Sequence, residues 1–242
     1  MTRNPSTIPL SKEDIRFTHF NSSPASPPGP YGVPSSIWKR VNLINLTIIL
    51  ELLSPLVAFG YHSPSLKTGN GVLLDKPGKA SYDSPASFRI IVLLKTISRI
   101  LKQIMTVRLS AIARSRGLLH PNQCGSLPGL SVSDACLALT HEVKTLQRPR
   151  LKVSTLFLYI KAGFANVNTS ALRARLLASQ VPSYMVDWVS SFLSERTCTL
   201  VFQGSPNLPS RVSVGTPRDH LFLPSSPSDM LPAFTCRYQQ AS

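Results

Sequence analysis

The feature that most constrains the fold is an apolar run followed by a turn of small residues, Leu151–Val167, which reads LKVSTLFLYIKAGFANV. β-branched and aromatic residues dominate this run, which is typical of a β-strand. Both faces of such a strand would be largely apolar, because alternate residues point to opposite sides. One face would hold Val153, Thr155, Phe157 and Tyr159, and the other Leu156, Leu158 and Ile160. The sequence therefore predicts a central strand in a sheet covered on both faces.

Composition favours a globular protein with an anionic partner. The chain has 242 residues, 43% of them hydrophobic, which is enough to bury a core. Its formal net charge is +15 at pH 7. A charge of that size favours polyanions, with nucleic acid first and an anionic membrane second, although a merely basic surface is the alternative.

The cysteines and the apolar stretches bear on compartment and membrane. The four cysteines include no C-x-x-C pair, so no zinc pattern or disulfide framework is predicted and a reducing compartment is expected. Asn4, Pro5 and Lys12 stand where a signal peptide would need an apolar core, so an intracellular protein is expected. The most apolar stretch, 41–59, is interrupted by polar residues and by Pro55. A buried helix is predicted there, with a membrane span as the alternative.

Local signals predict the remaining elements. Helices are expected from Ser11, at 36–53, at 91–116, at 131–146, from Asn168 and at 183–193, and a hairpin joins TCTLVFQ to SRVSV. The helix at 36–53 would present Ile37, Val41, Ile44, Ile48 and Leu52 on one stripe. The helix at 131–146 would turn Val132, Cys136, Leu139, Val143 and Leu146 inward. A short strand from Gly71 is expected to enter the turn KPGK.

Two basic features are open to two interpretations each. The lysines of KPGK, Lys76 and Lys79, suit phosphate contact, and a solvated turn is the alternative. Along the helix at 91–116, Lys95, Arg99 and Lys102 form a stripe. This stripe would either follow a nucleic-acid backbone or be a solvated face.

Several motifs together resemble the reverse transcriptases of non-LTR retrotransposons. Leu151–Val167 resembles the family's L-D-I-K-x-A-F-D-x-V strand motif, and SPPGPYGVP resembles its A-P-G-P-D-G-x-P element with Tyr31 in place of the aspartate. KPGK and SFRIIVLL follow in the family's order, and so do the Gln123–Ala135 element and Val214–Pro217. The resemblance covers residues 11–217.

The resemblance implies an α+β fold, namely a partial right-hand polymerase with the fingers and part of the palm and without the thumb. It puts Lys76 and Arg89 where fingers residues grip the triphosphate of a nucleotide, a task that suits the forked guanidinium of arginine. It puts Phe164 at the aromatic that screens the sugar 2′ position. Tyr159 stands at the metal-binding aspartate of the strand motif, and Ala165 at its second aspartate.

The intact family uses two Mg²⁺ ions held by carboxylates, and this chain lacks those carboxylates. No Asp-Asp pair occurs in the sequence. A phenol, with an ordinary pKa of about 10, does not replace an anionic ligand. An inactive fragment that binds no metal is therefore predicted, with RNA or DNA as a non-specific electrostatic partner, self-association, and no membrane. The alternatives are a non-enzymatic basic nucleic-acid-binding protein and a decayed reading frame without function.

The end of the resemblance has an explanation in the reading frame. After Pro217 the family continues Q-G-S-P-L-S-P-L, whereas this chain reads RDHLFLPSS. Deleting one base from the preceding proline codon of a sequence that encodes the family motif yields PRDHLFLPS. The predicted organisation is therefore an irregular segment at 1–35, reverse-transcriptase-like fingers and partial palm at 36–217, and an out-of-frame, unstructured tail at 218–242.

Overall fold

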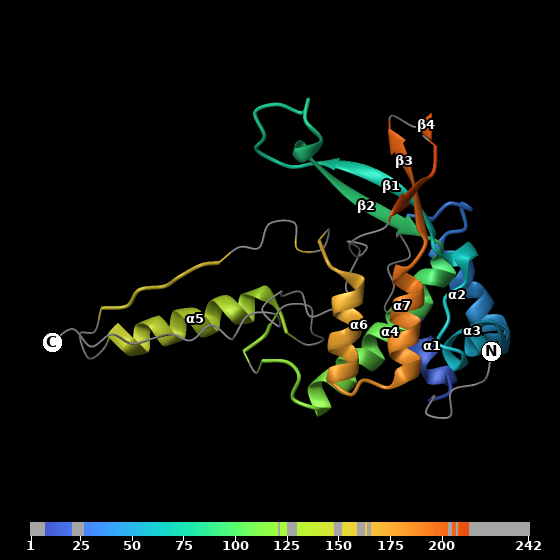
Figure 1. The fold of residues 1–242 in the computed structure, drawn as a ribbon, viewed down its shortest axis with the longest axis horizontal. Coiled ribbons are helices and arrows are strands. Elements are labelled where there is room, and N and C mark those ends of the chain that lie inside the picture. Colours follow the sequence, from blue (N-terminus) through green and yellow to red (C-terminus); the bar gives the residue numbers. More distant parts are fainter. Residues whose placement is uncertain are drawn as a thin grey trace.

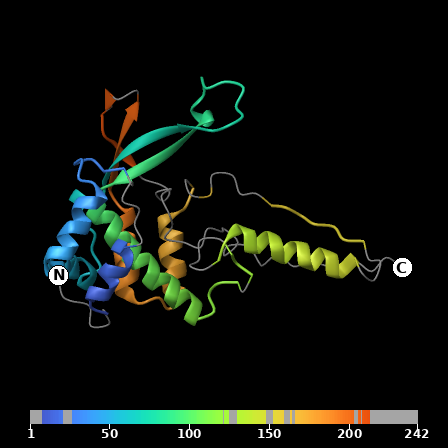
Figure 2. The same ribbon diagram turned by 180° about the vertical axis from the view of Figure 1, so that it is seen from behind.

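The chain forms a helical body, a sheet beside it, and a helix, α5, that extends away from both (Figures 1 and 2). This computed structural model describes residues 8–20, 27–120, 122–124, 130–147, 152–158, 163, 166–202, 205–206 and 208–212. The predicted tail at 218–242 lies outside the described residues. The mixed α/β architecture agrees with the predicted α+β class.

The sheet is built around a hairpin that was predicted only in part. β1 (Thr68–Asp75) pairs antiparallel with β2 (Phe88–Leu94), and Asp75 lies opposite Phe88. β3 (Arg196–Phe202) runs parallel to β1. β4 (Ser205–Pro206) and β5 (Ser210–Val212) pair antiparallel with β3, which confirms the hairpin predicted after residue 196. Two 3₁₀ turns, η1 (Pro64–Leu66) and η2 (Pro85–Ser87), precede β1 and β2.

The core lies between helices rather than on a covered sheet. α3 (Leu46–Ala58), α4 (Thr96–Ser115) and α7 (Ser183–Leu193) supply most of it, and α1 (Lys12–Phe20) and α6 (Thr169–Ala178) close its sides. Trp188, Tyr184 and Phe192 of α7 are fully buried. Removing large apolar side chains from water stabilises the body, so α7 is its central element. The predicted α7 and the cap of α6 by Asn168, whose Oδ1 accepts from Ser170 and Ala171, are confirmed.

The predicted single helix at 36–53 is wrong, because the chain breaks at Asn45. α2 (Ser35–Ile44) and α3 meet there, and Asn45 caps α3 by accepting a hydrogen bond from Thr47 N–H at 3.1 Å. The break changes the phase of the second helix, so Leu46, Ile49, Leu53 and Val57 are buried. The predicted stripe is largely exposed instead, with Ile37, Ile48 and Leu52 about half accessible. Pro55 lies inside α3 rather than ending it.

Within the described residues, no single helix is long and apolar enough to span a membrane. Only α2 and α3 taken together meet that test, and they are bent by 108°.

The predicted helix at 91–116 begins later than expected. Residues 88–94 are held in the β1–β2 ladder, and α4 starts at Thr96. Apolar residues such as Ile91 and Val92 fit either element, and pairing with β1 decides for the strand. The end agrees with the prediction, since Gly117 has a φ of +62° after the cap residue Arg116.

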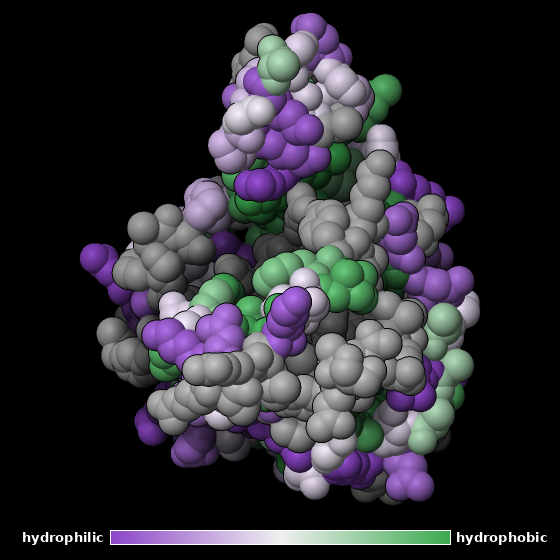
Figure 3. All heavy atoms as spheres, turned by 90° about the vertical axis from the view of Figure 1, so that its left-hand side faces the viewer, coloured by the Kyte–Doolittle hydropathy of each residue, from purple (hydrophilic) through white to green (hydrophobic). Residues whose placement is uncertain are grey.

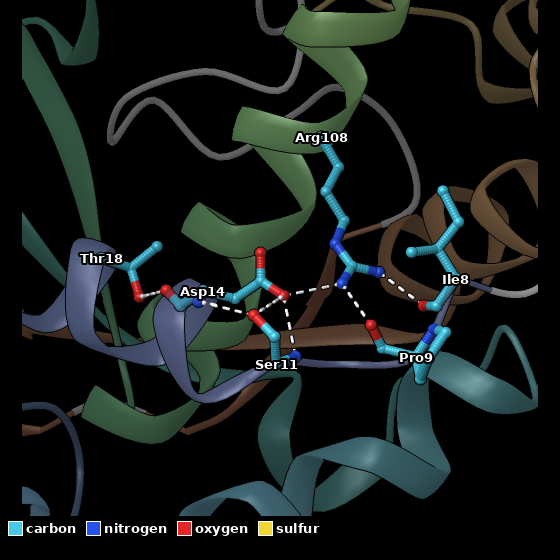
Figure 4. A network of polar contacts seen from close by, with 6 residues as sticks. All are labelled: Ile8, Pro9, Ser11, Asp14, Thr18 and Arg108. Atoms are coloured by element: carbon cyan, nitrogen blue, oxygen red, sulfur yellow. Dashed lines mark hydrogen bonds and ion pairs between the residues drawn. The ribbon is translucent and has the colours of Figure 1, made fainter.

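A polar cluster fixes the N-terminal segment to α4 (Figure 4). Arg108 donates to the carbonyls of Ile8 at 2.7 Å and Pro9 at 2.8 Å, and pairs with Asp14 at 2.8 Å. Asp14 also accepts from Ser11 N–H at 2.9 Å in the predicted capping box. Burial alone would raise the pKa of Asp14, but the hydrogen bonds from Ser11 and the pairing with Arg108 lower it below its usual range.

α5 (Val132–Gln147) is formed as predicted but does not pack as predicted. Its capping box is present, with Ser131 N–H donating to Asp134 Oδ2 at 2.7 Å, and these bonds lower the pKa of Asp134. None of its residues is buried, so the inward stripe is wrong. The helix extends away from the body in both views, and its apolar positions find no covering element among the described residues (Figures 1 and 2).

The predicted central strand is also wrong where it is described. Residues 152–158 have no regular secondary structure, and Leu156, Phe157 and Leu158 are 73%, 78% and 58% exposed. A strand exists only where a neighbour completes its hydrogen bonds, and the ladders of β1 to β5 do not reach this segment. Figure 3, in which the α5 side faces the viewer, shows hydrophobic surface among hydrophilic residues on this side.

Candidate nucleic-acid interface

The β1–β2 hairpin brings the two predicted phosphate-contacting residues together. Arg89 lies opposite Leu74, and Lys76 N–H donates to Ser87 O at 2.9 Å, which continues the ladder by one pair. Alternation then puts Lys76, Leu74 and Arg89 on the same face of the sheet. Lys76 is half-buried and Arg89 is exposed. The hairpin thus places an ammonium and a guanidinium beside each other near its tip.

The loop between these strands is folded back on the hairpin. Tyr82 donates its hydroxyl to the carbonyl of Lys76 at 2.8 Å, and its ring lies 5.8 Å from that of Phe88. Ser87 Oγ donates to Ser81 O at 2.7 Å. Gly78 has a φ of +76°, which only glycine adopts without strain, so the KPGK turn is formed as predicted. These contacts restrict the backbone that carries Lys76.

A third cation, Arg211, lies on the same face. It pairs with Thr197 of β3, and Thr197 pairs with Thr68 of β1, so alternation places Arg211 on the same face as Lys76 and Arg89, at the end of the sheet away from the hairpin tip. No acidic residue occurs at the described positions of this face, which also include Asn70 and Thr199. We call this surface the basic face of the sheet. Its arrangement suits phosphate groups, since guanidinium pairs with two oxygens at once.

The opposite face of the sheet turns toward the helical body. Leu94 belongs to the core, and Val92 packs against it. Cys198 of β3 is buried there, and burial raises the pKa of its thiol, which keeps it protonated and unreactive. Cys124, Cys136 and Cys198 are all free thiols, while Cys236 lies outside the described residues.

The basic stripe expected on α4 does not form, and both interpretations of it are wrong. Lys95 and Lys102 are each 6% exposed, and Arg99 is half-buried. Lys95 donates to the carbonyl of Ser65 and lies over the ring of Tyr31. Arg99 donates to Thr96 Oγ1 at 3.2 Å. Burial and these contacts therefore keep the three cations from forming a solvent-facing stripe.

A buried histidine that the sequence did not single out lies at the centre of the body. His62 is 0% exposed, its Nε2 is 3.0 Å from Ser98 Oγ, and its ring meets Trp188 and Phe192 edge-on. Burial lowers the pKa of His62 to about 4; the backbone of Leu66 opposes that shift, and the charge of Lys67 adds to it. The ring is thus neutral near pH 7. Its complete burial keeps it from any substrate, so its role is in packing.

Two cations near the start of β3, Lys67 and Arg196, are also buried. Lys67 Nζ donates to Ser194 Oγ at 3.2 Å. Burial lowers the pKa of Lys67, and the nearby charge of Glu195 opposes the shift. Burial likewise lowers the pKa of Arg196, whose Nε donates to the carbonyl of Leu193. Both residues fix the entry to β3 rather than facing a ligand.

Comparison with known proteins decides the family. A family model described as "Reverse transcriptase (RNA-dependent DNA polymerase)" matches residues 74–217, more than half of the chain. The chain belongs to the reverse transcriptase family.

A curated relative narrows this assignment. Over 185 residues the chain is 24% identical to the "Probable RNA-directed DNA polymerase from transposon X-element" of Drosophila melanogaster. The match covers 76% of this chain and 20% of the relative, so the chain spans about a fifth of that protein's length. The predicted resemblance is confirmed: this is a reverse transcriptase domain of the non-LTR retrotransposon kind.

The matched range relates the reverse transcriptase motifs to the structure. It begins at Leu74, on the hairpin strand that leads to Lys76, and it ends at Pro217. The three motif residues Tyr159, Phe164 and Ala165 lie outside the described residues. Their predicted roles stay predictions.

The strand motif of this chain lacks the carboxylates that hold the metal pair in an intact reverse transcriptase. Among the described residues no three His, Cys, Asp or Glu side chains gather as a metal site. In the sequence, Tyr159 stands where the strand motif needs a carboxylate, and no Asp-Asp pair follows. Mg²⁺ requires hard oxygen ligands in near-octahedral geometry, which a neutral phenol and an alanine do not supply.

Proposed function

We propose that this reverse transcriptase domain binds nucleic acid through the basic face of its sheet and does not polymerise nucleotides. The observation that carries the proposal is the alignment of Lys76, Arg89 and Arg211 on one sheet face without an acidic residue among its described positions. The hairpin with its helical support would be the fingers of the polymerase hand. The motif strand after residue 151 would be a remnant of the palm.

Charge supports a backbone-directed, sequence-tolerant mode of binding. The chain carries a net charge of +15, and guanidinium and ammonium groups pair with phosphate oxygens without reading bases. Each phosphate neutralised releases counterions, so affinity falls as salt rises. Both RNA and DNA present such a backbone. Binding is therefore proposed to be electrostatic and indifferent to sequence.

The missing carboxylates support the absence of polymerase activity. Two-metal catalysis stabilises the attacking and leaving oxygens of phosphoryl transfer, and it needs anionic ligands to hold both ions. The family match ends at Pro217, and the sequence that follows departs from the family's next motif. The Tyr159→Asp change supplies only one ligand, so it is not expected to restore synthesis.

Binding is tested with the full chain and a fluorescein-labelled 20-nucleotide oligonucleotide, by anisotropy at several salt concentrations. The Lys76→Ala/Arg89→Ala variant is expected to weaken binding roughly tenfold. The slope of log binding constant against log salt concentration should become shallower by about two, because two phosphate contacts are lost. Lys144→Ala/Lys152→Ala is the matched control, because it also removes two exposed cations, one from α5 and one from the segment that follows it, away from the sheet. Equal loss in both variants would show that only net charge matters, and it would contradict an interface on the basic face.

Synthesis is tested by primer extension on a primed RNA template with Mg²⁺ or Mn²⁺. No extension above a no-protein control is expected from this chain or from Tyr159→Asp. Extension by protein free of contaminating polymerase would contradict the proposed loss of activity.

A further inference from the structure

A short turn before α2 is docked rigidly on the junction between β2 and α4. Gly32 N–H donates to Gly29 O at 2.9 Å, and Thr96 Oγ1 donates to Val33 O at 3.0 Å. Gly29 packs so closely that an added Cβ would lie 2.5 Å from the carbonyl oxygen of Leu94. No side chain fits at Gly29, so the turn rests directly on the backbone of β2. The structure therefore holds residue 31 in a defined position.

That position carries an exposed aromatic ring. Tyr31 is 72% exposed although its backbone is fixed on both sides. The ammonium of Lys95 lies 3.8 Å from the centroid of its ring, within the range of a cation–π contact. Lys95 itself is 6% exposed and is also held by the carbonyl of Ser65. The ring is thus supported by a buried cation from within and remains largely open to solvent.

The location of Tyr31 relates it to the basic face. Arg89, Ile91, Leu93 and Lys95 alternate along β2, so Lys95 leaves the strand on the side that carries Arg89. Six residues of strand separate the two cations by roughly 20 Å at ~3.3 Å per residue. An extended polyanion that contacts Lys76 and Arg89 at the tip of the hairpin can therefore reach the ring of Tyr31 at its base.

The charge around the turn identifies the class of partner. Residues 27–50 include Lys39 and Arg40 and no acidic residue. An exposed tyrosine can also anchor a protein partner, but the charged group that contacts this ring is the ammonium of Lys95. Aromatic rings beside a basic groove are the usual device for binding single-stranded nucleic acid, because every base has a π-face that can stack. Paired bases inside a duplex do not offer that face.

We propose that Tyr31 is a stacking platform for an unpaired base of a single strand whose phosphates run along the basic face. This inference rests on the proposed function and deepens it, because it selects single-stranded over duplex nucleic acid. The contact is tolerant of sequence, since stacking does not read hydrogen-bonding edges. Its rigid mounting lowers the entropy lost on binding, because the ring is ordered before the strand arrives.

The test compares the full chain with Tyr31→Leu and Tyr31→Phe, using a labelled dT20 single strand and a 20-base-pair duplex. Tyr31→Leu is expected to weaken single-strand binding by roughly 5- to 50-fold, within the range for one stacked base. Duplex binding and the salt slope should change less than twofold, because no phosphate contact is lost. Tyr31→Phe keeps the ring and should bind within about twofold of the unchanged protein.

A second readout guards against misfolding of the leucine variant. Tryptophan at the same position, Tyr31→Trp, should be quenched by dT20, whereas Phe17→Trp on α1 provides an exposed control away from the sheet. Equal quenching at both positions would overturn the inference, and so would Tyr31→Leu binding dT20 as tightly as the unchanged protein.

The two proposals fail differently. If Lys76→Ala/Arg89→Ala weakens binding and Tyr31→Leu does not, the interface stands and the stacking inference is wrong. If only Tyr31→Leu weakens binding, the interface on the basic face is wrong. If the full chain does not bind dT20 at low salt, both are wrong.

Discussion

Helices α1 and α5 begin with the same capping box, yet they differ in what their other residues contact. Ser11 with Asp14 and Ser131 with Asp134 make matching hydrogen bonds. In α1, Ile15 is fully buried against the body, and Arg108 reaches Asp14 from α4. In α5 no residue is buried. A cap can start a helix, but only a packing partner joins it to the cooperative fold.

This difference predicts where substitutions change global stability. The largest effect is expected for Trp188→Ala in α7, where the side chain is 0% exposed and stacks on Phe192 at 5.3 Å. Its loss should lower the free energy of unfolding by about 3–5 kcal/mol. Leu137→Ala in α5, where the side chain is 71% exposed, should change it by less than about 0.5 kcal/mol. Urea unfolding measures both, and similar losses would show that α5 belongs to the cooperative unit.

The next largest effect concerns pH. The pKa of His62 is lowered to about 4 from 6.5 on folding, so the unfolded chain takes up the proton first. The contribution of neutral His62 to the free energy of unfolding is fully present above pH 6.5 and is lost as pH falls toward 4. At 1.36 kcal/mol per unit of difference, the loss approaches about 3 kcal/mol near pH 4.

Two variants separate His62 from the other titrating groups. His62→Gln should reduce the dependence of the unfolding free energy between pH 6.5 and 5, whereas His141→Gln on exposed α5 should leave it unchanged. The same pH profile in His62→Gln as in the unchanged protein would contradict the assignment.

A smaller effect is expected from ion pairs. Arg108→Ala removes three hydrogen bonds from a side chain that is 12% exposed, and it should cost about 2 kcal/mol. Arg173→Ala removes the Arg173–Asp187 pair, in which both side chains are 47% exposed, and it should cost at most about 0.5 kcal/mol. Chemical denaturation of both variants at equal salt measures the two losses in the free energy of unfolding. If Arg108→Ala lowers the free energy of unfolding less than Arg173→Ala does, the polar cluster does not fix the N-terminal segment to α4.

The smallest effect distinguishes the two capping boxes directly. Ser11→Ala should lower global stability by about 1 kcal/mol, because α1 unfolds with the body. Ser131→Ala should destabilise α5 by a similar amount locally and leave the global transition unchanged. Hydrogen exchange reports the local opening and thermal unfolding the global one. A shift of the global midpoint in Ser131→Ala would mean that α5 is docked.

Local chemistry made much of this fold predictable. Capping by Ser11, Ser131 and Asn168, the turn at Gly78 and the end of α4 at Gly117 all follow from single residues and their neighbours. The phase of α3, the burial of Lys95 and Lys102 and the exposure of α5 do not, because each depends on which distant element lies alongside. Periodicity shows that a helix has an apolar stripe without showing what covers it.

Some residues of the candidate site were predictable from the sequence and others were not. Lys76 and Arg89 were predicted, because their spacing suits a strand–turn–strand and their motif resembles the family. Arg211 was missed, since its place on the same face depends on the register of β5 on β3 and of β3 on β1. Tyr31 stood out only as a replacement for an aspartate. Its exposure and its contact with Lys95 arise from the docking of the turn on β2, which sequence spacing does not show.

The parallel pairing of β1 with β3 has a consequence for how the chain acquires its structure. β1 can form its hairpin with β2 early, because the loop that joins the two strands, residues 76–87, is far shorter than the chain between β1 and β3. Its other edge is completed only by β3, after all the helices from α4 to α7 have been made. Closing so long a loop is slow, since its entropy is lost before the pairing compensates for it. During synthesis the edge of β1 that β3 will occupy is therefore unpaired for a time, and in that interval it can pair with another chain.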